Sequence, residues 1–236
     1  LKERYGAQSF FFTDECFALS PTKRLCQQMI DRQVNVKWTC ELRFEKNLTR
    51  ELLGQMRDAG CLKIVFGLES FNQRVMDFMK KGIKQESVRR IVDDCVDLGI
   101  AVHCYVIVGF PTEKEEEALD TMNFVVGNKK LHESYGFSCQ PCLFDLEKEA
   151  PIMSDPGSYG IRRIMRPATE DLSLGFFYEV QEGMTPAQAE QLYQQVYEKI
   201  SEVVCELPFN YSMADGLLYI ARAKSQALQV PQPTGS

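Results

Sequence analysis

The chain has 236 residues, of which 44% are hydrophobic, and its formal net charge is −6. That apolar fraction can build the core of one large α/β domain or two small ones. Lysines and arginines form no basic block, which argues against a nucleic-acid partner, and no apolar run reaches the roughly 18 residues that a bilayer span requires.

Nine cysteines are spread along the chain, an odd number that argues against a disulfide framework. Most of them lie in apolar strand or helix patterns, and no secretory signal precedes them. A reducing compartment fits this usage, so we expect a cytoplasmic protein.

The first elements are two strands, each followed by a helix. An apolar run at 10–12 ends in Thr13, Asp14 and Glu15, and a helix should begin at Ser20 with Pro21 at its first position. The stretch 34–44, "VNVKWTCELRF", reads as the second strand, and the next helix should begin after Thr49.

The third strand, "CLKIVFGL" at 61–68, runs directly into Glu69 and Ser70. Helices are expected over 72–81 and 85–98, and "AVHCYVIVGF" at 101–110 is the fourth strand. An acidic helix at 112–126 places carboxylates at its positive N-terminus, and a fifth strand covers 136–144.

Strand and helix therefore alternate five times, and the strands are nearly continuous apolar runs, as in a parallel sheet covered by helices. Such a series forms an open sheet or a barrel, and the polar residues at the strand ends favour the barrel. In barrels, functional side chains gather at the C-terminal ends of the strands. We therefore expect Asp14, Arg43 and Glu69 to lie at one shared rim.

The pattern changes near residue 146. We expect a partial barrel over 1–146, a loop and mainly helical extension over 147–228 with a clear amphipathic helix after Thr185, and a flexible tail over 229–236. The extension should pack on the barrel as an appendage.

The segments "TDECF", "AGCLKIVFGLES", "KKG" and "VGFPTEKEEE", at these spacings, resemble the radical S-adenosylmethionine (SAM) superfamily. The resemblance covers residues 9–126, and it is greatest to the branch whose members often carry a cobalamin-binding domain. It implies a partial (βα)6 barrel that binds SAM at the C-terminal ends of its strands. In that family a [4Fe–4S] cluster, held by a CxxxCxxC loop after the first strand, cleaves SAM to a 5′-deoxyadenosyl radical.

The resemblance also implies roles for residues of this chain at the matching positions. Thr13, Asp14 and Glu15 match the strand end that holds the SAM amino group, although the family's Gly-Gly pair is missing here. Arg43 is similar to an arginine that reaches the SAM carboxylate, and Glu69 with Ser70 matches a group at the ribose hydroxyls or the methionine end. The positions that flank adenine correspond to Ile107, Gly109 and Glu113.

No CxxxCxxC motif occurs in the 236 residues, and the first βα unit of the family barrel has no counterpart. A cluster needs three or four converging thiolates, so we expect no metal site in this chain and expect the cluster ligands upstream of it. Cys139 and Cys142 are two thiols three positions apart on one strand, which face opposite sides and complete no site.

Simpler interpretations remain open for the same residues. Ser70 could be only a helix N-cap, Arg43 could pair with Glu41 or Glu45 at the surface, and Asp14 could be a solvated loop carboxylate. For the whole chain, the main hypothesis is the SAM-binding part of a radical enzyme, with cobalamin-dependent methylation of a small molecule or peptide as its reaction. The rivals are a cluster-less binding or scaffold barrel and a barrel enzyme that uses paired carboxylates.

Overall fold

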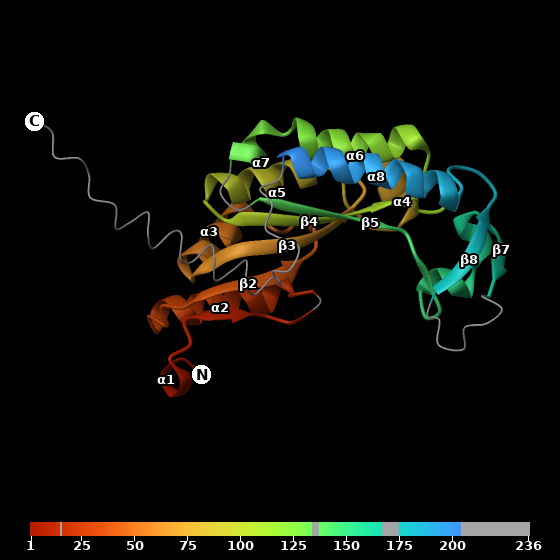
Figure 1. Ribbon diagram of the computed structural model, residues 1–236. Coiled ribbons are helices and arrows are strands. Elements are labelled where there is room, and N and C mark those ends of the chain that lie inside the picture. The colour runs from red at the N-terminus through yellow and green to blue at the C-terminus, as the bar shows by residue number, and fades with distance from the viewer. Residues whose placement is uncertain (15, 134–136, 167–174, 204–236) are drawn as a thin grey trace, which may run out of the picture.

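The computed structural model describes residues 1–14, 16–133, 137–166 and 175–203. Its main feature is one sheet of five parallel strands in the order β1-β2-β3-β4-β5, which form a half-barrel (Figure 1). The strands are β1 (Ser9–Phe11), β2 (Lys37–Leu42), β3 (Cys61–Glu69), β4 (Ala101–Val108) and β5 (Ser138–Leu143). The expected α/β class and five strands of a partial barrel are confirmed.

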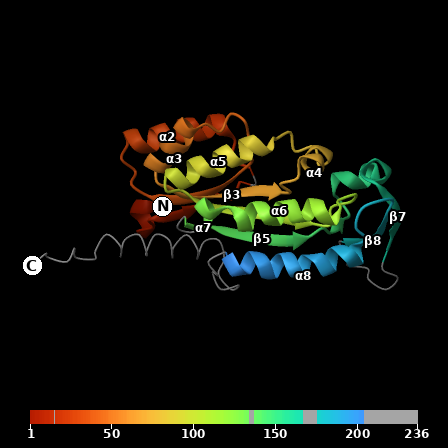
Figure 2. The ribbon, with the colours of Figure 1, turned by 90° about the horizontal axis from the view of Figure 1, so that it is seen from above.

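Helices cover the convex face of this sheet. Figure 2 shows the helices in the order α2, α3, α5, α6 and α8 across the molecule, and direct packing joins α2 to α3, α3 to α5 and α6 to α8. The helices of the described chain are α1 (Lys2–Tyr5), α2 (Leu19–Asp31), α3 (Arg50–Asp58), α4 (Gln73–Phe78), α5 (Gln85–Asp97), α6 (Glu115–Gly127), α7 (Lys129–Glu133) and α8 (Pro186–Val203).

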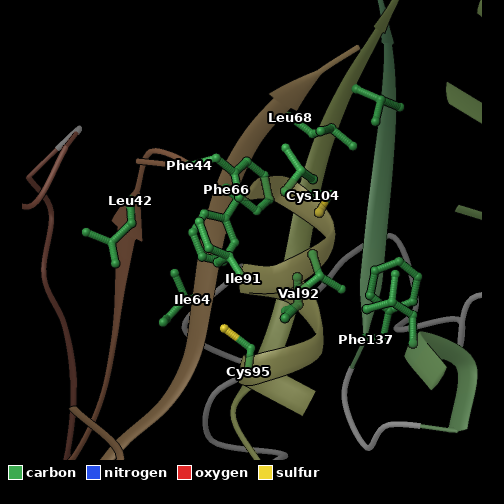
Figure 3. Packing of buried hydrophobic residues seen from close by; sticks show 14 of the residues in the cluster. Leu42, Phe44, Ile64, Phe66, Leu68, Ile91, Val92, Cys95, Cys104 and Phe137 are labelled. Carbon is green, nitrogen blue, oxygen red and sulfur yellow. The ribbon is translucent and has the colours of Figure 1, made fainter. Parts of the chain in front are cut away.

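The core lies between the sheet and these helices. Cys104, Val106 and Val108 of β4 are buried in it, so the alternating residues His103, Tyr105 and Ile107 face the concave side. Figure 3 shows how side chains of β2, β3 and β4 meet Ile91, Val92 and Cys95 of α5. Each large side chain buried here stabilises the fold by roughly 1.5–3 kcal/mol relative to its exposed state.

The residues that cap the helix N-termini could be predicted from the sequence for α3 but not for α2. Thr49 is the N-cap of α3, as expected, because its hydroxyl accepts the Leu52 amide at 3.2 Å. The expectation for Ser20 is wrong: Ala18 is the N-cap of α2 and Ser20 lies inside the first turn. There the Thr22 hydroxyl donates to the Ala18 carbonyl at 2.7 Å and closes the turn from within.

The C-terminal extension contains a second sheet besides its long helix. This antiparallel sheet has the order β6-β8-β7 and comprises β6 (Leu146–Glu147), β7 (Ile161–Met165) and β8 (Gly175–Val180), with the 3-10 turns η1 (Pro151–Ser154) and η2 (Pro156–Tyr159) between β6 and β7. A small core of its own holds it together: Leu146, Ile152, Ile161 and Tyr178. Residues 204–228 of the expected extension and the tail 229–236 lie outside the described residues.

Helix α8 joins this extension to the half-barrel. It packs against α6 and against β5 and β4, and its buried face consists of Ala189, Leu192, Val196 and Ile200. The expected amphipathic helix after Thr185 is therefore confirmed, and its apolar face belongs to the main core.

Candidate SAM-binding rim

Five strands bring their C-terminal ends to one edge of the half-barrel, which we call the rim. Thr13 and Asp14 follow β1 and are exposed, and Arg43 follows β2 and is also exposed. Ile107, near the end of β4, is half-buried and lies beside Cys142 of β5 in the strand register. The structure thus brings these residues of the predicted site to one edge, while Glu15 lies outside the described residues.

Glu69 ends β3 in an unusual backbone conformation. Its φ is +60°, and the register between β3 and β4 shifts between Gly67 and Glu69. A positive φ is uncommon for a residue other than glycine and often marks a functional constraint. This local irregularity interrupts the alternation of side chains just where the strand meets the rim.

The Glu69 carboxylate is paired with Lys81, from the loop between α4 and α5. The Lys81 ammonium donates to Oε1 of Glu69 at 3.0 Å and lies 3.5 Å from the Gly67 carbonyl. The two side chains are only 20% and 23% exposed, so solvent screens this pair less than a surface pair. Arg43 donates to the Lys81 carbonyl at 3.4 Å, which ties the ends of β2 and β3 through one loop. Lys81 was not predicted as a site residue, although it lies in the "KKG" segment.

The pKa values of Cys142 and Tyr105 respond to carboxylates of other strands. Burial, and after it the Glu69 carboxylate, raise the pKa of the Cys142 thiol. Burial raises the pKa of Tyr105 as well, and the neighbouring Glu41 and Cys142 add to the effect. Glu69 and Glu41 are therefore close enough to Cys142 and Tyr105 to influence their ionisation.

Ser70 departs from the predicted arrangement. Its side chain is fully buried on the convex side, where its hydroxyl lies 3.2 Å from Oγ1 of Thr121 in α6. It also accepts the Asn72 amide at 3.2 Å, while Asn72 itself is the N-cap of α4. The structure therefore brings Glu69 to the rim and turns its neighbour Ser70 into the core.

Gly109 and Glu113 are joined within the loop that follows β4. The Gly109 amide donates to Oε2 of Glu113 at 2.7 Å, and the Glu113 carbonyl accepts the Met184 amide at 2.8 Å. Glu113 is 1% exposed, and burial raises its pKa to about 8. Its other oxygen, Oε1, has no hydrogen-bond partner in the described part of the chain. The backbone contact links the loop to the C-terminal extension, and the buried Glu113 side chain is not exposed at the rim.

One cavity among the described residues lies away from the rim. It has a volume of about 540 Å³ on the helical side and is lined by residues of α5, α6 and the neighbouring loops, including Phe71, Arg89 and Phe124. Arg89 stacks over Phe71 at 4.7 Å, which closes part of the surface there. This cavity is lined by helices and loops, whereas the predicted site residues lie at the ends of the strands.

Among the described residues, no three His, Cys, Asp or Glu side chains are grouped so that they could hold a metal ion. Burial raises the pKa of the Cys26, Cys61, Cys95, Cys104 and Cys139 thiols, which disfavours the thiolates that a cluster requires. These residues do not fit a [4Fe–4S] cluster. In the same ranges no helix is both long and apolar enough to cross a membrane.

Comparison with known families identifies the half-barrel. The family model described as the radical SAM superfamily matches residues 1–125. The chain belongs to the radical SAM superfamily. The match spans β1 to β4, and hence the strand ends that carry Asp14, Arg43, Glu69 and Ile107.

Two relatives of this radical SAM chain are named as methyltransferases. An uncharacterized methyltransferase of Pyrococcus horikoshii is 28% identical over 137 residues, which cover 57% of this chain and 29% of the relative. The cytidylyl-2-hydroxyethylphosphonate methyltransferase of Streptomyces wedmorensis is 26% identical over 115 residues, covering 47% of this chain and 21% of the relative. The chain thus spans less than a third of the length of either relative.

Solved structures share the fold. The radical SAM methyltransferase TsrM of Kitasatospora setae, solved with cobalamin and a [4Fe–4S] cluster, aligns with a TM-score of 0.63 at 14% identity, covering 97% of this chain and 54% of that one. Coproporphyrinogen III oxidase of Escherichia coli, a radical SAM enzyme, aligns with a TM-score of 0.56 at 13% identity, covering 83% of this chain and 40% of that one. The alignment with TsrM includes the C-terminal extension, so this part of the chain also has a structural counterpart.

Proposed function

We propose that this chain is the SAM-binding half-barrel of a radical SAM methyltransferase that contains further sequence. The observation that carries the proposal is the family match over residues 1–125 together with the position of Asp14, Arg43, Glu69 and Ile107 at strand ends along one rim. The methyltransferase names of the two relatives support methyl transfer as the reaction. Cobalamin is proposed as a cofactor of the whole protein because TsrM was solved with it.

The rim residues have the chemistry that SAM would require. Arg43 is exposed, and the one hydrogen bond that it makes within the described residues, at 3.4 Å, leaves most of its guanidinium donors available for a carboxylate. Asp14 is an exposed carboxylate suited to an ammonium group. Glu69 can accept a ribose hydroxyl on the oxygen that Lys81 does not hold, and Ile107 offers an apolar surface to adenine.

Radical chemistry needs a [4Fe–4S] cluster, and the described residues do not fit one. We propose that the whole protein holds the cluster with cysteines outside the 236 residues. This chain contributes the SAM-binding rim and the half-barrel that carries it. The substrate is a small molecule or a peptide. A cluster-less binding barrel would share the rim but would not cleave SAM.

Two measurements on the whole protein test this proposal. The first is the gene sequence around the coding region of this chain, where we expect a CxxxCxxC motif within about one βα unit, roughly 30–40 residues, of residue 1. The second is anaerobic incubation with iron, sulfide, a reductant and SAM, where we expect 5′-deoxyadenosine or methylated product. A whole protein that binds SAM without either product would instead be the binding module.

A further inference from the structure

The Glu69 carboxylate lies folded back over its own strand. Gly67, two residues earlier in β3, leaves the room for it: a Cβ atom at position 67 would come within 2.6 Å of Oε1 and 3.6 Å of Cδ of Glu69. The positive φ of Glu69 turns the backbone at this point away from an ordinary strand conformation. A side chain at position 67 would therefore take the place that the carboxylate occupies.

Lys81 holds the carboxylate in this place. Its ammonium donates to Oε1 of Glu69 and to the Gly67 carbonyl, and a Cβ atom at position 67 would lie 3.7 Å from Nζ. The ammonium thus contacts both ends of the segment that the carboxylate folds over. Because the two charged side chains are mostly buried, solvent competes with this pair less than with a surface pair.

The loop that carries Lys81 is itself fixed from two sides. The Lys81 amide donates to the carbonyl of Met76, a fully buried residue of α4, at 3.0 Å, and its carbonyl accepts from Arg43. The preceding residue, Lys80, has a φ of +57°, a conformation that persists only where the surrounding structure holds it. Lys81 therefore contacts Arg43 through its backbone and Glu69 through its side chain.

We propose that Lys81 and Gly67 are positioning residues of the SAM site, which act by fixing the orientation of the Glu69 carboxylate. The inference rests on the proposed function, in which Glu69 accepts a ribose hydroxyl of SAM. With Oε1 held by Lys81 above Gly67, the second oxygen has one defined direction before the ligand arrives. The side-chain freedom of Glu69 is then lost on folding and not on binding, which strengthens binding.

Gly67→Ala tests the position of the carboxylate without changing any charge. Its clash falls on the end of a flexible side chain, and Gly67 has no positive φ, so the variant should fold with a thermal midpoint close to that of the wild type. In calorimetric titration it should bind SAM about fivefold to tenfold more weakly, the loss expected for one displaced hydrogen bond. Gly54→Ala, with open space around it, should bind SAM like the wild type.

Two adjacent lysines give a matched pair of variants. Lys81→Met removes the ammonium that holds Glu69 and should weaken SAM binding about fivefold to tenfold. Lys80→Met removes the same charge one residue earlier, where Nζ lies 4.9 Å from the centre of the Tyr159 ring, and should leave SAM affinity unchanged.

The Glu69→Gln background separates positioning from direct contact with SAM. If Lys81 and Gly67 act through the carboxylate, Lys81→Met and Gly67→Ala should weaken binding much less in this background than in the wild type. A direct contact of Lys81 with SAM would instead give the same loss in both backgrounds, and this result would overturn the positioning role.

A double-mutant cycle in urea unfolding tests the pair without SAM. The effects of Lys81→Met and Glu69→Gln on the free energy of unfolding should not add, whereas those of Lys80→Met and Glu69→Gln should add. Additive effects in the first cycle, or wild-type SAM affinity in Gly67→Ala, would overturn the inference, and Gly67→Ala decides it alone if Lys81→Met does not fold. A wild-type chain that does not bind SAM would overturn the proposed function and this role with it, while the first cycle would still show whether Lys81 holds Glu69.

Discussion

Gly109 at the end of β4 lies directly against Ala189 of α8. A Cβ atom at position 109 would come within 2.4 Å of the Ala189 Cβ, and the Gly109 backbone has a φ of +85°. The Tyr178 hydroxyl is 3.5 Å from the Gly109 carbonyl, so the extension meets this glycine from two elements. The turn after β4 therefore fixes α8 and the second sheet onto the half-barrel.

Gly109→Ala should destabilise the protein by about 2–4 kcal/mol, because it adds both a positive-φ strain and an overpacked contact. Urea unfolding followed by circular dichroism measures this change. Gly54→Ala is the matched control, since Gly54 lies in α3 with open space around it and alanine there should stabilise the helix by about 0.5–1 kcal/mol. A Gly109→Ala variant as stable as the wild type would show that α8 does not pack as described.

Glu113 should make the stability depend on pH. Its pKa is raised from 4.5 to about 8 in the folded chain, mainly by burial, so folding favours the protonated form. This contribution is fully present below about pH 4.5 and is lost as the pH rises towards 8, with a limiting slope of about 1.4 kcal/mol per pH unit. The free energy of unfolding of the wild type should therefore fall as the pH rises from 5 to 8.

Glu113→Gln removes the titrating group and keeps an oxygen for the Gly109 amide. Its stability should be nearly constant over the same pH range, while Glu149→Gln, at an exposed position, should behave as the wild type. If the free energy of unfolding fell equally steeply with pH in the wild type and in Glu113→Gln, another group would cause the pH dependence.

Substitutions of the adjacent residues Glu69 and Ser70 should separate SAM affinity from stability. Ser70→Ala removes the contacts with Thr121 and the Asn72 amide, so it should cost about 1–2 kcal/mol of stability and leave SAM affinity unchanged. Glu69→Gln should change stability by at most about 1 kcal/mol and should weaken SAM binding by about tenfold. Calorimetric titration with SAM and thermal unfolding of both variants test these roles. A loss of SAM affinity in Ser70→Ala but not in Glu69→Gln would contradict them.

The sequence predicts the half-barrel well, because its central strands β2, β3 and β4 are largely buried and read as nearly continuous apolar runs. It also predicts which strand ends are polar. Ser70 could not be placed in this way, since the register shift and the positive φ of Glu69 depend on pairing with β4. The small sheet of the extension was not predicted, because β6 and β8 pair across a long separation in sequence.

The buried polar residues of β3 and β4 show a signal that the sequence does carry. Lys63 and His103 are each a polar residue inside an otherwise apolar strand, and polar residues in such strands are buried only with partners or for function. Their common partner Ser138 is 75 residues from Lys63, so only the folded sheet brings the three together.

SAM binding to the 236-residue chain tests the central claim most directly. Isothermal titration calorimetry should show saturable binding of one SAM per chain, weakened about tenfold or more by Arg43→Met and unchanged by Arg57→Met, which alters an arginine on α3 that pairs with Asp58. Absence of binding at millimolar SAM, or equal binding by the wild type and Arg43→Met, would contradict the assignment of the rim as the SAM site.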